Sequence, residues 1–411
     1  MSNPRHLAIL KSLATKSDSK IVFLVMDGIG GIRTTTHGTT ELEAASTPNL
    51  DRLAQRASLG RIIPALRGMT VGSGPGHLAL FGYDPVAEEN EIGRGVLEAV
   101  GVDYALKPHE VAARGNFATL DAAGLISDRR AGRIGSDEGT RVCAKMQAAV
   151  AEPIDGVSVK VLPVKEYRFC VVFDGPDLEG AFLDTDPQVT GKAPLPVRPS
   201  VEGPHTERTR KVIEAAIAKM SAAIKDEPKA NGFSLRGFAK DPGIETLQQR
   251  WGMRCGAIAT HPLYRGVARL VGMDILKTGT EIADEFETLK QHWNEYDFFF
   301  LHVKKTDSYG EDGNRRGKIS IIEETDRHLA WLGEKLNDVI VVTGDHCTPP
   351  PMRGHSFHPV PTMIAAKTSD VGGNLRFCER TCVTGSLGLF PSMELMQLAL
   401  GHAGKLQKFG A

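Results

Sequence analysis

Three runs of almost uninterrupted apolar residues recur along the chain, and each one ends in polar residues. The runs lie within residues 20–31, 296–307 and 338–361. Continuous apolar runs of this length predict strands that are buried on both faces, as in a parallel sheet. Each run ends in an acid, and the three acids are Asp27, Asp307 and Asp345.

Segments with helical spacing alternate with these runs. Residues 46–58 start with two candidate N-caps, Ser46 and Thr47, followed by Pro48 in the first turn. Their apolar positions fall on one helical face: Leu50, Leu53, Ala54 and Ala57. Residues 315–336 have a second helical pattern. This alternation predicts a doubly wound, mostly parallel α/β sheet, in which ligands bind beyond the carboxyl ends of the strands.

The middle of the chain has a different pattern. Residues 114–200 contain short strand-like runs, hairpin-like turns and an excess of arginine. They predict a smaller α+β cap domain inserted between two parts of the core, residues 1–113 and 201–411. Residues 197–208 have the proline, glycine and polar composition of a linker, so we expect residues 231–240 to rejoin the core.

Composition excludes some classes of partner. The chain has 411 residues, and its 49 basic and 50 acidic residues leave a net charge of −1, which argues against a nucleic-acid or anionic-membrane partner. An anionic ligand must therefore be held by a local cluster. The six cysteines are scattered without a C-x-x-C pair, and the N-terminal residues lack the apolar stretch of a signal peptide. We expect a cytoplasmic protein with reduced thiols.

The acids at the strand ends are the main chemical signal. Any one of them is explained as a turn former, because Asp is common in turns. Three together, with histidines close by, indicate a site for one or two divalent ions of the manganese or zinc kind, since oxygen and imidazole ligands suit those ions better than calcium. The donor set is Asp27, Asp307, Glu311, Asp345, His346 and His355. His77, His302 and His358 are interpreted as packing or supporting residues.

Ser73 is a candidate nucleophile in the glycine-rich residues 68–85. Residues 75–82 after it have the pattern of a short helix, whose N-terminal amides would favour an anion beside the serine. A flexible turn with an N-capping serine explains the same residues equally well. A serine needs a nearby base or metal ion to act as a nucleophile, and the predicted metal site would supply one.

Arginines form the third candidate group. Guanidinium groups bind phosphate and carboxylate with paired hydrogen bonds, which suits a substrate that carries both. Solvated surface charge explains any single arginine, so the inference depends mainly on the cluster in residues 128–133. The candidates are Arg114, Arg129, Arg130, Arg133 and Arg236.

A set of motifs spans nearly the whole chain in one order. They read MDGIGG, TPNLDRLA, GSGPGHLALFGYDP, VAARGNFATLD, DRRAGR, DTDPQVTGKAPLP, LRG, HVKKTDSYGEDG, GDHCTPP and GHSFHPVP. Together they resemble the cofactor-independent (2,3-bisphosphoglycerate-independent) phosphoglycerate mutases of the archaeal type, which are members of the alkaline phosphatase superfamily. The resemblance implies an alkaline-phosphatase-like core and interconversion of 3-phosphoglycerate and 2-phosphoglycerate through a phosphoserine.

The resemblance also implies roles for individual residues. Ser73 matches the phosphorylated nucleophile, which also binds metal, and Lys304 matches a lysine near the transferring phosphoryl group. Asp27, Asp345 and His346 match the ligands of the ion beside Ser73, and Asp307 and His355 match ligands of a second ion. The five arginines match substrate-binding motifs. The implied cofactors are two divalent ions, above all Mn²⁺ with Mg²⁺, Zn²⁺ or Co²⁺ as alternatives, and no 2,3-bisphosphoglycerate.

One motif departs from the family. The usual TDEAGHDG reads TDSYGEDG here, which puts Glu311 where a histidine ligand is expected. The implied partner is a small phosphoglycerate, with no nucleic acid or membrane, and the oligomeric state is left open. Two other functions also stay open: a phosphopentomutase or phosphomonoesterase of the same superfamily, and a non-catalytic protein that binds metal or phosphate.

Overall fold

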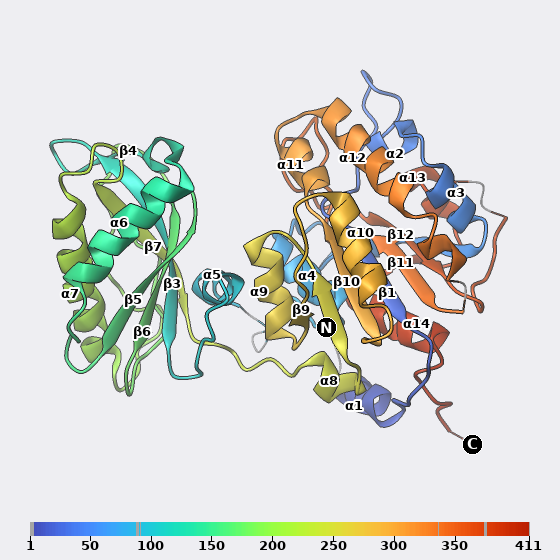
Figure 1. The fold of residues 1–411 in the computed structure, drawn as a ribbon, viewed down its shortest axis with the longest axis horizontal. Coiled ribbons are helices and arrows are strands. Elements are labelled where there is room, and N and C mark those ends of the chain that lie inside the picture. Colours follow the sequence, from blue (N-terminus) through green and yellow to red (C-terminus); the bar gives the residue numbers. More distant parts are fainter. Residues whose placement is uncertain (1–3, 88–89, 91, 336, 374–375, 411) are drawn as a thin grey trace. The chain divides into compact units, whose positions relative to one another are not determined.

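A computed structural model describes residues 4–87, 90, 92–335, 337–373 and 376–410 (Figure 1). The chain forms two compact units. The first consists of Met1–Glu91 and Glu245–Ala411, and the second of Ile92–Ile244. The expected insert, residues 114–200, therefore lies inside a larger second unit. Each unit has its own sheet and its own core.

The first unit is built around an eight-stranded sheet in the described part of the chain. Its strands, in spatial order, are β13 (Gly388–Pro391), β2 (Ala57–Ile63), β12 (Val360–Ala365), β11 (Val339–Thr343), β1 (Ile21–Met26), β10 (Phe298–Val303), β8 (Cys255–Ile258) and β9 (Asp274–Ile275). The neighbours β11, β1 and β10 are parallel, whereas β12 runs antiparallel to both β11 and β2. The predicted mostly parallel α/β sheet is confirmed.

The three predicted buried strands are the adjacent strands β11, β1 and β10. All their residues are buried, because helices and loops cover the sheet. Parallel neighbours end at the same edge of a sheet, so the polar residues after these strands are brought together. Gly28 and Asp345, for example, are hydrogen-bonded there although 317 positions separate them. This edge carries the candidate site.

Helices of the first unit pack in two groups. One contains α2 (Glu41–Ala44), α3 (Pro48–Ala54), α10 (Ile282–Gln291), α11 (Lys305–Glu311) and α12 (Arg315–His328), and the other contains α4 (Ser73–Leu80) and α9 (Pro262–Leu270). The remaining helices are α1 (Pro4–Ser12), α8 (Leu247–Trp251), α13 (Glu379–Thr384), α14 (Leu395–His402) and the short 3₁₀ turns η3 (Leu332–Glu334) and η4 (Ser392–Glu394).

Two predicted helices are shorter than expected. The helix predicted over residues 46–58 ends at Ala54, and Ala57 begins β2, because pairing with β12 outweighs the helical spacing. Thr47 occupies its N-cap without capping a backbone amide, and its hydroxyl instead donates to the Asp51 carboxylate at 3.4 Å. The helix predicted over residues 315–336 ends at His328 and is followed by η3.

The second unit contains an antiparallel sheet. Its strands are β3 (Val111–Leu120), β4 (Ile126–Asp128), β5 (Ser158–Lys165), β6 (Arg168–Asp174) and β7 (Gly232–Ala239), and its helices are α5 (Arg94–Gly101), α6 (Ser136–Ala149), α7 (Thr206–Ile224) and the 3₁₀ turn η2 (Ala131–Arg133). Successive residues of β3 and β6 pack alternately into two hydrophobic cores on opposite faces of the sheet. One core includes α6 and α7, and the other includes α5. This alternation is the period of a strand with both faces covered.

The expectation that residues 231–240 rejoin the core is wrong. They form β7, which pairs with β3 along Ala112–Ala118, and the last three residues of the expected linker, 206–208, begin α7. The chain returns to the first unit only after Ile244. Strand-like spacing predicts a strand but does not specify which sheet it joins.

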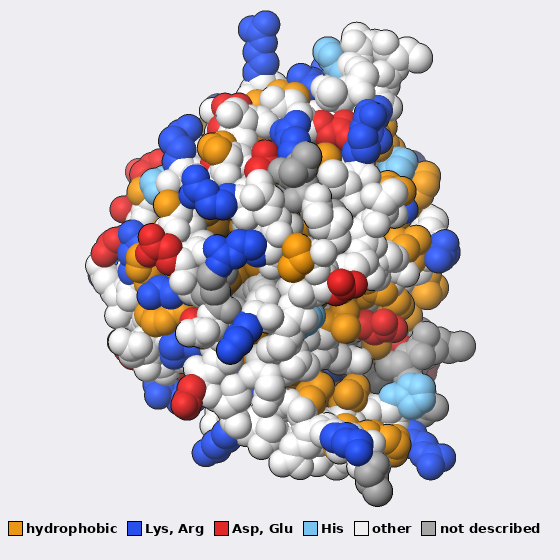
Figure 2. Space-filling model, turned by 90° about the vertical axis from the view of Figure 1, so that its right-hand side faces the viewer, with side chains coloured by type: hydrophobic (Ala, Val, Ile, Leu, Met, Phe, Trp, Pro, Cys, Tyr) orange, Lys and Arg blue, Asp and Glu red, His pale blue; other side chains and the backbone are white. Residues whose placement is uncertain are grey.

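The surface and thiols agree with an ordinary globular chain. On the face drawn in Figure 2, basic and acidic side chains are interspersed and hydrophobic side chains occupy scattered areas. All six cysteines are buried, and their thiols are free. Among the residues that the structure describes, no helix combines the length and apolar character of a membrane span.

Candidate active site

Acids at the ends of three neighbouring strands meet at one edge of the large sheet. Asp27 directly follows β1, Asp345 lies two residues beyond β11, and Asp307 lies in α11 after β10. The amide of Asp27 donates to the Val303 carbonyl at 3.0 Å, and the amide of Gly28 donates to Asp345 Oδ1 at 3.1 Å. Asp27, Asp307 and Asp345 are all buried. Parallel strand pairing thus assembles the predicted acids.

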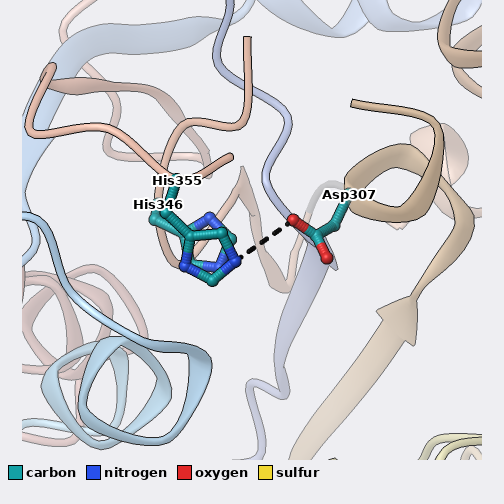
Figure 3. Close-up of side chains that lie close together, drawn as sticks. All are labelled: Asp307, His346 and His355. Carbon is teal, nitrogen blue, oxygen red and sulfur yellow. Dashed lines mark ion pairs between the residues drawn. The ribbon is translucent and has the colours of Figure 1, made fainter. Parts of the chain in front are cut away.

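Two groups of donors could each hold a metal ion. One contains Asp27, Asp345 and His346, and the other contains Asp307, His346 and His355. His346 Nε2 lies 3.5 Å from Asp27 Oδ1 and 3.1 Å from Asp345 Oδ2. Figure 3 shows His355 stacked against His346 and directed at Asp307, with 3.5 Å between His355 Nε2 and Asp307 Oδ1. His346 is therefore shared by both groups.

Hydrogen bonds select which imidazole nitrogen faces the donors. His355 Nδ1 donates to the Val71 carbonyl at 2.9 Å, which leaves Nε2 for Asp307. The Thr348 hydroxyl donates to Asp307 Oδ1 at 2.6 Å, so its oxygen is the acceptor for His346 Nδ1 at 3.1 Å. Both histidines thus direct Nε2 toward the carboxylates, as a metal-ligating imidazole with a supporting partner does, and a bound ion would replace any proton on that nitrogen.

The carboxylates fit a divalent cation. Asp27 Oδ1 and Asp345 Oδ2 are buried and accept no hydrogen bond of good geometry from the described residues, although imidazole nitrogens lie near both: His346 Nε2 faces each oxygen, and His77 Nδ1 is 3.2 Å from Asp345 Oδ2. A buried anionic oxygen without a partner is costly, and a bound cation removes that cost. The mixed carboxylate and imidazole donors suit manganese, zinc and related ions.

The titration behaviour of the same groups reflects a strongly negative site. Burial alone would raise the pKa of Asp345, but His346 and His77 outweigh it and hold that pKa well below its usual range. Burial alone would lower the pKa of His346, yet Asp345, Asp27 and Asp307 raise it to about 9. The acids therefore favour positive charge at this position, which is the condition for binding a cation.

Ser73 faces the shared histidine. It is the first residue of α4, and its Oγ lies 3.3 Å from His346 Nε2. Gly72 is the N-cap, so the alternative of an N-capping serine is wrong. His77 Nδ1 donates to the Ser73 carbonyl at 2.7 Å, and a Cβ on Gly76 would come within 2.9 Å of the Asp345 carbonyl oxygen. Glycine at this position lets α4 approach the strand end closely.

Lys304 lies at the same edge. Its Nζ is 3.0 Å from Asp27 Oδ2 and also forms an ion pair with Asp307. Burial would lower the pKa of this lysine, but the two carboxylates raise it above its ordinary value. Lys304 is therefore a positive charge between the acids of the two donor groups.

Tyr264 is a buried site residue that the sequence did not indicate. Its hydroxyl donates to Asp27 Oδ2 and lies 3.4 Å from Ser73 Oγ. Its ring stacks on His302 with 3.8 Å between the ring centroids. The one available signal is its position shortly after the apolar residues 255–258, because that strand ends at the same edge of the sheet.

Glu311 lies beside the second donor group but outside it. Its Oε1 is 3.8 Å from His355 Nε2, and its side chain is 54% exposed. It is the last residue of α11, one helical turn after Asp307. The carboxylate is thus close enough to approach an ion at Asp307 and His355 after a change of side-chain rotamer.

The candidate arginines all lie in the second unit, and acids hold three of them, including Arg114, whose Nε lies 3.4 Å from Glu98 Oε1. Arg114 and Arg236 are register partners on β3 and β7. Arg129 Nη2 donates to Asp186 at 2.9 Å, and Arg236 Nε donates to Asp184 at 3.1 Å. The sequence did not indicate any of these acids. The side chains of Arg130 and Arg133 are exposed.

A serine that faces clustered carboxylates and imidazoles beyond the strand ends of an α/β sheet is the arrangement expected of a phosphoryl-transfer enzyme whose donors could hold metal ions. A family profile described as 2,3-bisphosphoglycerate-independent phosphoglycerate mutase matches residues 54–230. A probable enzyme of that name from Aquifex aeolicus is 46% identical over 411 residues, covering 98% of this chain and 100% of the relative. The chain belongs to the 2,3-bisphosphoglycerate-independent phosphoglycerate mutases.

Other relatives and solved structures agree. A probable 2,3-bisphosphoglycerate-independent phosphoglycerate mutase from Thermosipho melanesiensis is 47% identical over 403 residues, covering 98% of each chain. The PH0037 protein from Pyrococcus horikoshii superposes with a TM-score of 0.80 at 26% identity, covering 96% of this chain and all of that one. The cofactor-independent phosphoglycerate mutase from Thermoplasma acidophilum gives a TM-score of 0.71 at 28% identity, covering 94% and 100%.

Proposed function

We propose that this enzyme interconverts 3-phosphoglycerate and 2-phosphoglycerate through a phosphoserine on Ser73, without 2,3-bisphosphoglycerate. The observation that carries the proposal is the 3.3 Å separation between Ser73 Oγ and Nε2 of His346, the histidine common to both donor groups. The Ser73 hydroxyl is the proposed acceptor of the phosphoryl group, so a phosphorylated cofactor is not required. The cytoplasm is the proposed compartment, which the six free buried thiols support.

Two divalent ions are the proposed cofactors. Asp27, Ser73, Asp345 and His346 would hold one ion, and Asp307, Glu311 and His355 would hold the other. When bound, such ions act as Lewis acids toward phosphoryl oxygens and favour the ionised form of a nearby hydroxyl. Mn²⁺ is the preferred candidate, with Mg²⁺, Zn²⁺ and Co²⁺ as alternatives, because the donor set combines carboxylates with imidazoles.

The chain's own residues then perform the transfer. Ser73 Oγ forms a bond to phosphorus as the bond between phosphorus and the substrate oxygen breaks, and the proton lost by the serine hydroxyl balances the proton gained by the leaving glycerate oxygen. The released glycerate turns, and its other hydroxyl attacks the phosphoserine to regenerate Ser73. Lys304, held between Asp27 and Asp307, is proposed to neutralise charge on the transferring group.

The second unit is proposed to be the substrate-binding cap. Its arginines are suited to a ligand that carries both a phosphate and a carboxylate, as phosphoglycerate does. The proposed contacts are Arg114, Arg129, Arg130, Arg133 and Arg236. Salt bridges to Asp184 and Asp186 support this role, because they limit the rotamers of two of these guanidinium groups before substrate arrives.

Replacement of the nucleophile tests the proposal. In a mutase assay with Mn²⁺ and without 2,3-bisphosphoglycerate, Ser73→Ala should reduce turnover to a trace, since the proposed acceptor hydroxyl is removed. Mass spectrometry of the working wild-type enzyme should locate phosphate on Ser73. A control is Ser392→Ala, which removes a buried serine hydroxyl that lies outside the donor groups.

Two results would contradict the assignment. One is substantial mutase turnover by the Ser73→Ala variant, and the other is phosphate found on a different residue. Release of inorganic phosphate from 3-phosphoglycerate without formation of 2-phosphoglycerate would instead identify a phosphomonoesterase.

A further inference from the structure

Lys318 is a fully buried lysine that belongs to neither donor group. It lies on α12, and its side chain is 0% exposed. Its Nζ donates to three carbonyl oxygens: Gly28 at 2.8 Å, Gly30 at 3.1 Å and Thr348 at 2.9 Å. An ammonium has three N–H donors, so backbone oxygens use all of them. The group thus occupies the position that a bound monovalent cation would take among carbonyl oxygens.

These carbonyl oxygens come from the two loops that follow the ligand-bearing strands. Gly28 and Gly30 follow Asp27, and Thr348 lies two residues after His346. The Thr348 amide donates to the same glycine carbonyls, at 3.1 Å and 3.2 Å. Both loops therefore converge on one ammonium, which supplies the positive charge between them.

Thr348 extends the connection to the metal donors. As described above, its hydroxyl donates to Asp307 and accepts from His346. Gly310 of α11 packs directly against Thr348, where a Cβ would clash with the Thr348 carbonyl oxygen. The position of Thr348 therefore affects one donor of each candidate metal group.

We propose that Lys318 is a positioning residue of the metal site, whose ammonium joins the loop after Asp27 to the loop after His346 and so sets the spacing of the ligand atoms. Without it, three buried carbonyl oxygens lose a donor and the loops are no longer joined by a charge. This proposal rests on the proposed metal site. It assigns no contact between Lys318 and substrate.

Neighbouring charges suit an ammonium at this position. Burial lowers the pKa of Lys318, whereas the carboxylates of Glu41 and Glu379 favour its charged form. Both acids are buried. A neutral side chain of equal length would remove the positive charge that faces these acids. The ammonium of Lys318 is therefore neutralised by buried protein groups and not by solvent.

Metal affinity in charge-removing variants tests the proposal. Isothermal titration of the apo-enzyme with Mn²⁺ should show affinity weakened by at least about tenfold in Lys318→Met, the scale found when a supporting partner of a metal ligand is lost. Lys405→Met is the matched control, because Lys405 is also buried and donates to a carbonyl, that of Ser17 at 2.6 Å, away from the donors. The control should lose thermal stability but retain Mn²⁺ affinity.

Chemical rescue provides a second measurement that does not require the methionine variant to fold. Lys318→Ala leaves a cavity that propylammonium matches in length and charge. Propylammonium should raise both the melting temperature and the Mn²⁺ affinity of Lys318→Ala, whereas tetramethylammonium at the same ionic strength, which has no N–H donor, should raise neither. Wild-type enzyme should respond equally to the two salts.

The possible results distinguish a failure of the proposed role of Lys318 from a failure of the proposed metal site. Wild-type enzyme that binds no Mn²⁺ would contradict the metal site. Wild-type binding with unchanged affinity in Lys318→Met, equal loss of affinity in Lys405→Met, or no difference between the two salts would overturn the role of Lys318.

Discussion

Asp27 divides its two carboxylate oxygens between different partners. Oδ2 accepts a hydrogen bond from the Tyr264 hydroxyl and lies 3.0 Å from Lys304 Nζ. Oδ1 is buried without a hydrogen-bond partner in the described part of the chain and faces His346 at 3.5 Å. The protein therefore neutralises one oxygen and leaves the other for a cation. Tyr264 and Lys304 together fix the direction in which the free oxygen points.

Replacing Tyr264 by Phe should disturb this division while preserving the packing of the ring on His302. We expect kcat to fall about tenfold or more and Mn²⁺ affinity to weaken, with KM for 3-phosphoglycerate nearly unchanged, because the lost contact orients a ligand and does not bind substrate. Steady-state kinetics and Mn²⁺ titration provide the measurements.

Tyr83→Phe is the control for this tyrosine. Tyr83 is also buried, and its hydroxyl donates to the Glu245 carbonyl at 2.6 Å, outside the donor groups. The control should alter stability but not kcat. Equal kinetic effects in both variants would mean that Tyr264 acts only through folding.

Glu311 makes the second donor group more negative than the histidine of the family motif would. Carboxylates suit manganese and magnesium better than an additional imidazole does, so wild-type activity should be highest with Mn²⁺. Glu311→His should recover activity with Zn²⁺ or Co²⁺ better than Glu311→Ala does. Metal titration checks the ligand itself: unchanged affinity and stoichiometry in Glu311→Ala would remove Glu311 from the site.

At the scale of elements, helix α10 buries an acid that its amphipathic pattern alone would not explain. Glu285 is 3% exposed, and its Oε2 has no hydrogen-bond partner among the described residues. Burial raises the pKa of Glu285 from 4.5 to about 9. The carboxyl is therefore neutral in the folded chain at neutral pH, and the helix can pack this face without an ion pair.

This helix should make stability dependent on pH. Below pH 4.5 the Glu285 carboxyl is neutral in both states, and its contribution to stability is fully present. Between pH 4.5 and about 9 only the unfolded chain is ionised. The free energy of unfolding should then fall by up to about 1.4 kcal/mol per pH unit. Glu285→Gln should remove this decline, so its advantage over wild type in urea unfolding should grow from pH 5 to pH 8.

Glu287→Gln is the control on the same helix. The Glu287 side chain is 56% exposed, so its neutralisation should leave the pH dependence as in wild type. A constant difference between wild type and Glu285→Gln across this pH range would contradict the raised pKa.

At the scale of the whole molecule, the two compact units are expected to differ in how far a bound metal ion stabilises them. All donors of both candidate groups lie in the first unit, whereas the second unit has its own sheet and core. Binding to the folded state stabilises only the unit that contains the site. Metal removal is therefore expected to act on one unit of the chain.

Calorimetry with EDTA and with Mn²⁺ tests that difference. Mn²⁺ at about one hundred times its dissociation constant adds about 2.7 kcal/mol to the folded state. The melting transition of the first unit should then move up by about 5–10 °C. The transition of the second unit should stay in place, and the isolated segment 92–244 identifies it. A single transition that moves as a whole would mean that the units unfold together.

The sequence by itself determined the strands of the core and the acids at their ends. Burial on both faces leaves a continuous apolar run, so residues 20–31, 296–307 and 338–361 were recognisable as strands, and an acid after such a run stands out. The order of the motifs also identified the family. These signals are local, because each depends on residues that are close together in the chain.

Tertiary structure alone decided which segments meet. Residues 231–240 look like a strand in either unit, and only pairing with β3 assigns them to the second. Lys318 carries no local signal, and Tyr264 carries only its position after the apolar residues 255–258, because a tyrosine or lysine in a helix is ordinarily explained by packing or solvent. Their roles arise from contacts with Asp27, Gly28 and Thr348, across separations of 237, 290 and 30 positions. Such contacts form only when strand pairing brings the loops together, and hydrophobic spacing does not encode that pairing.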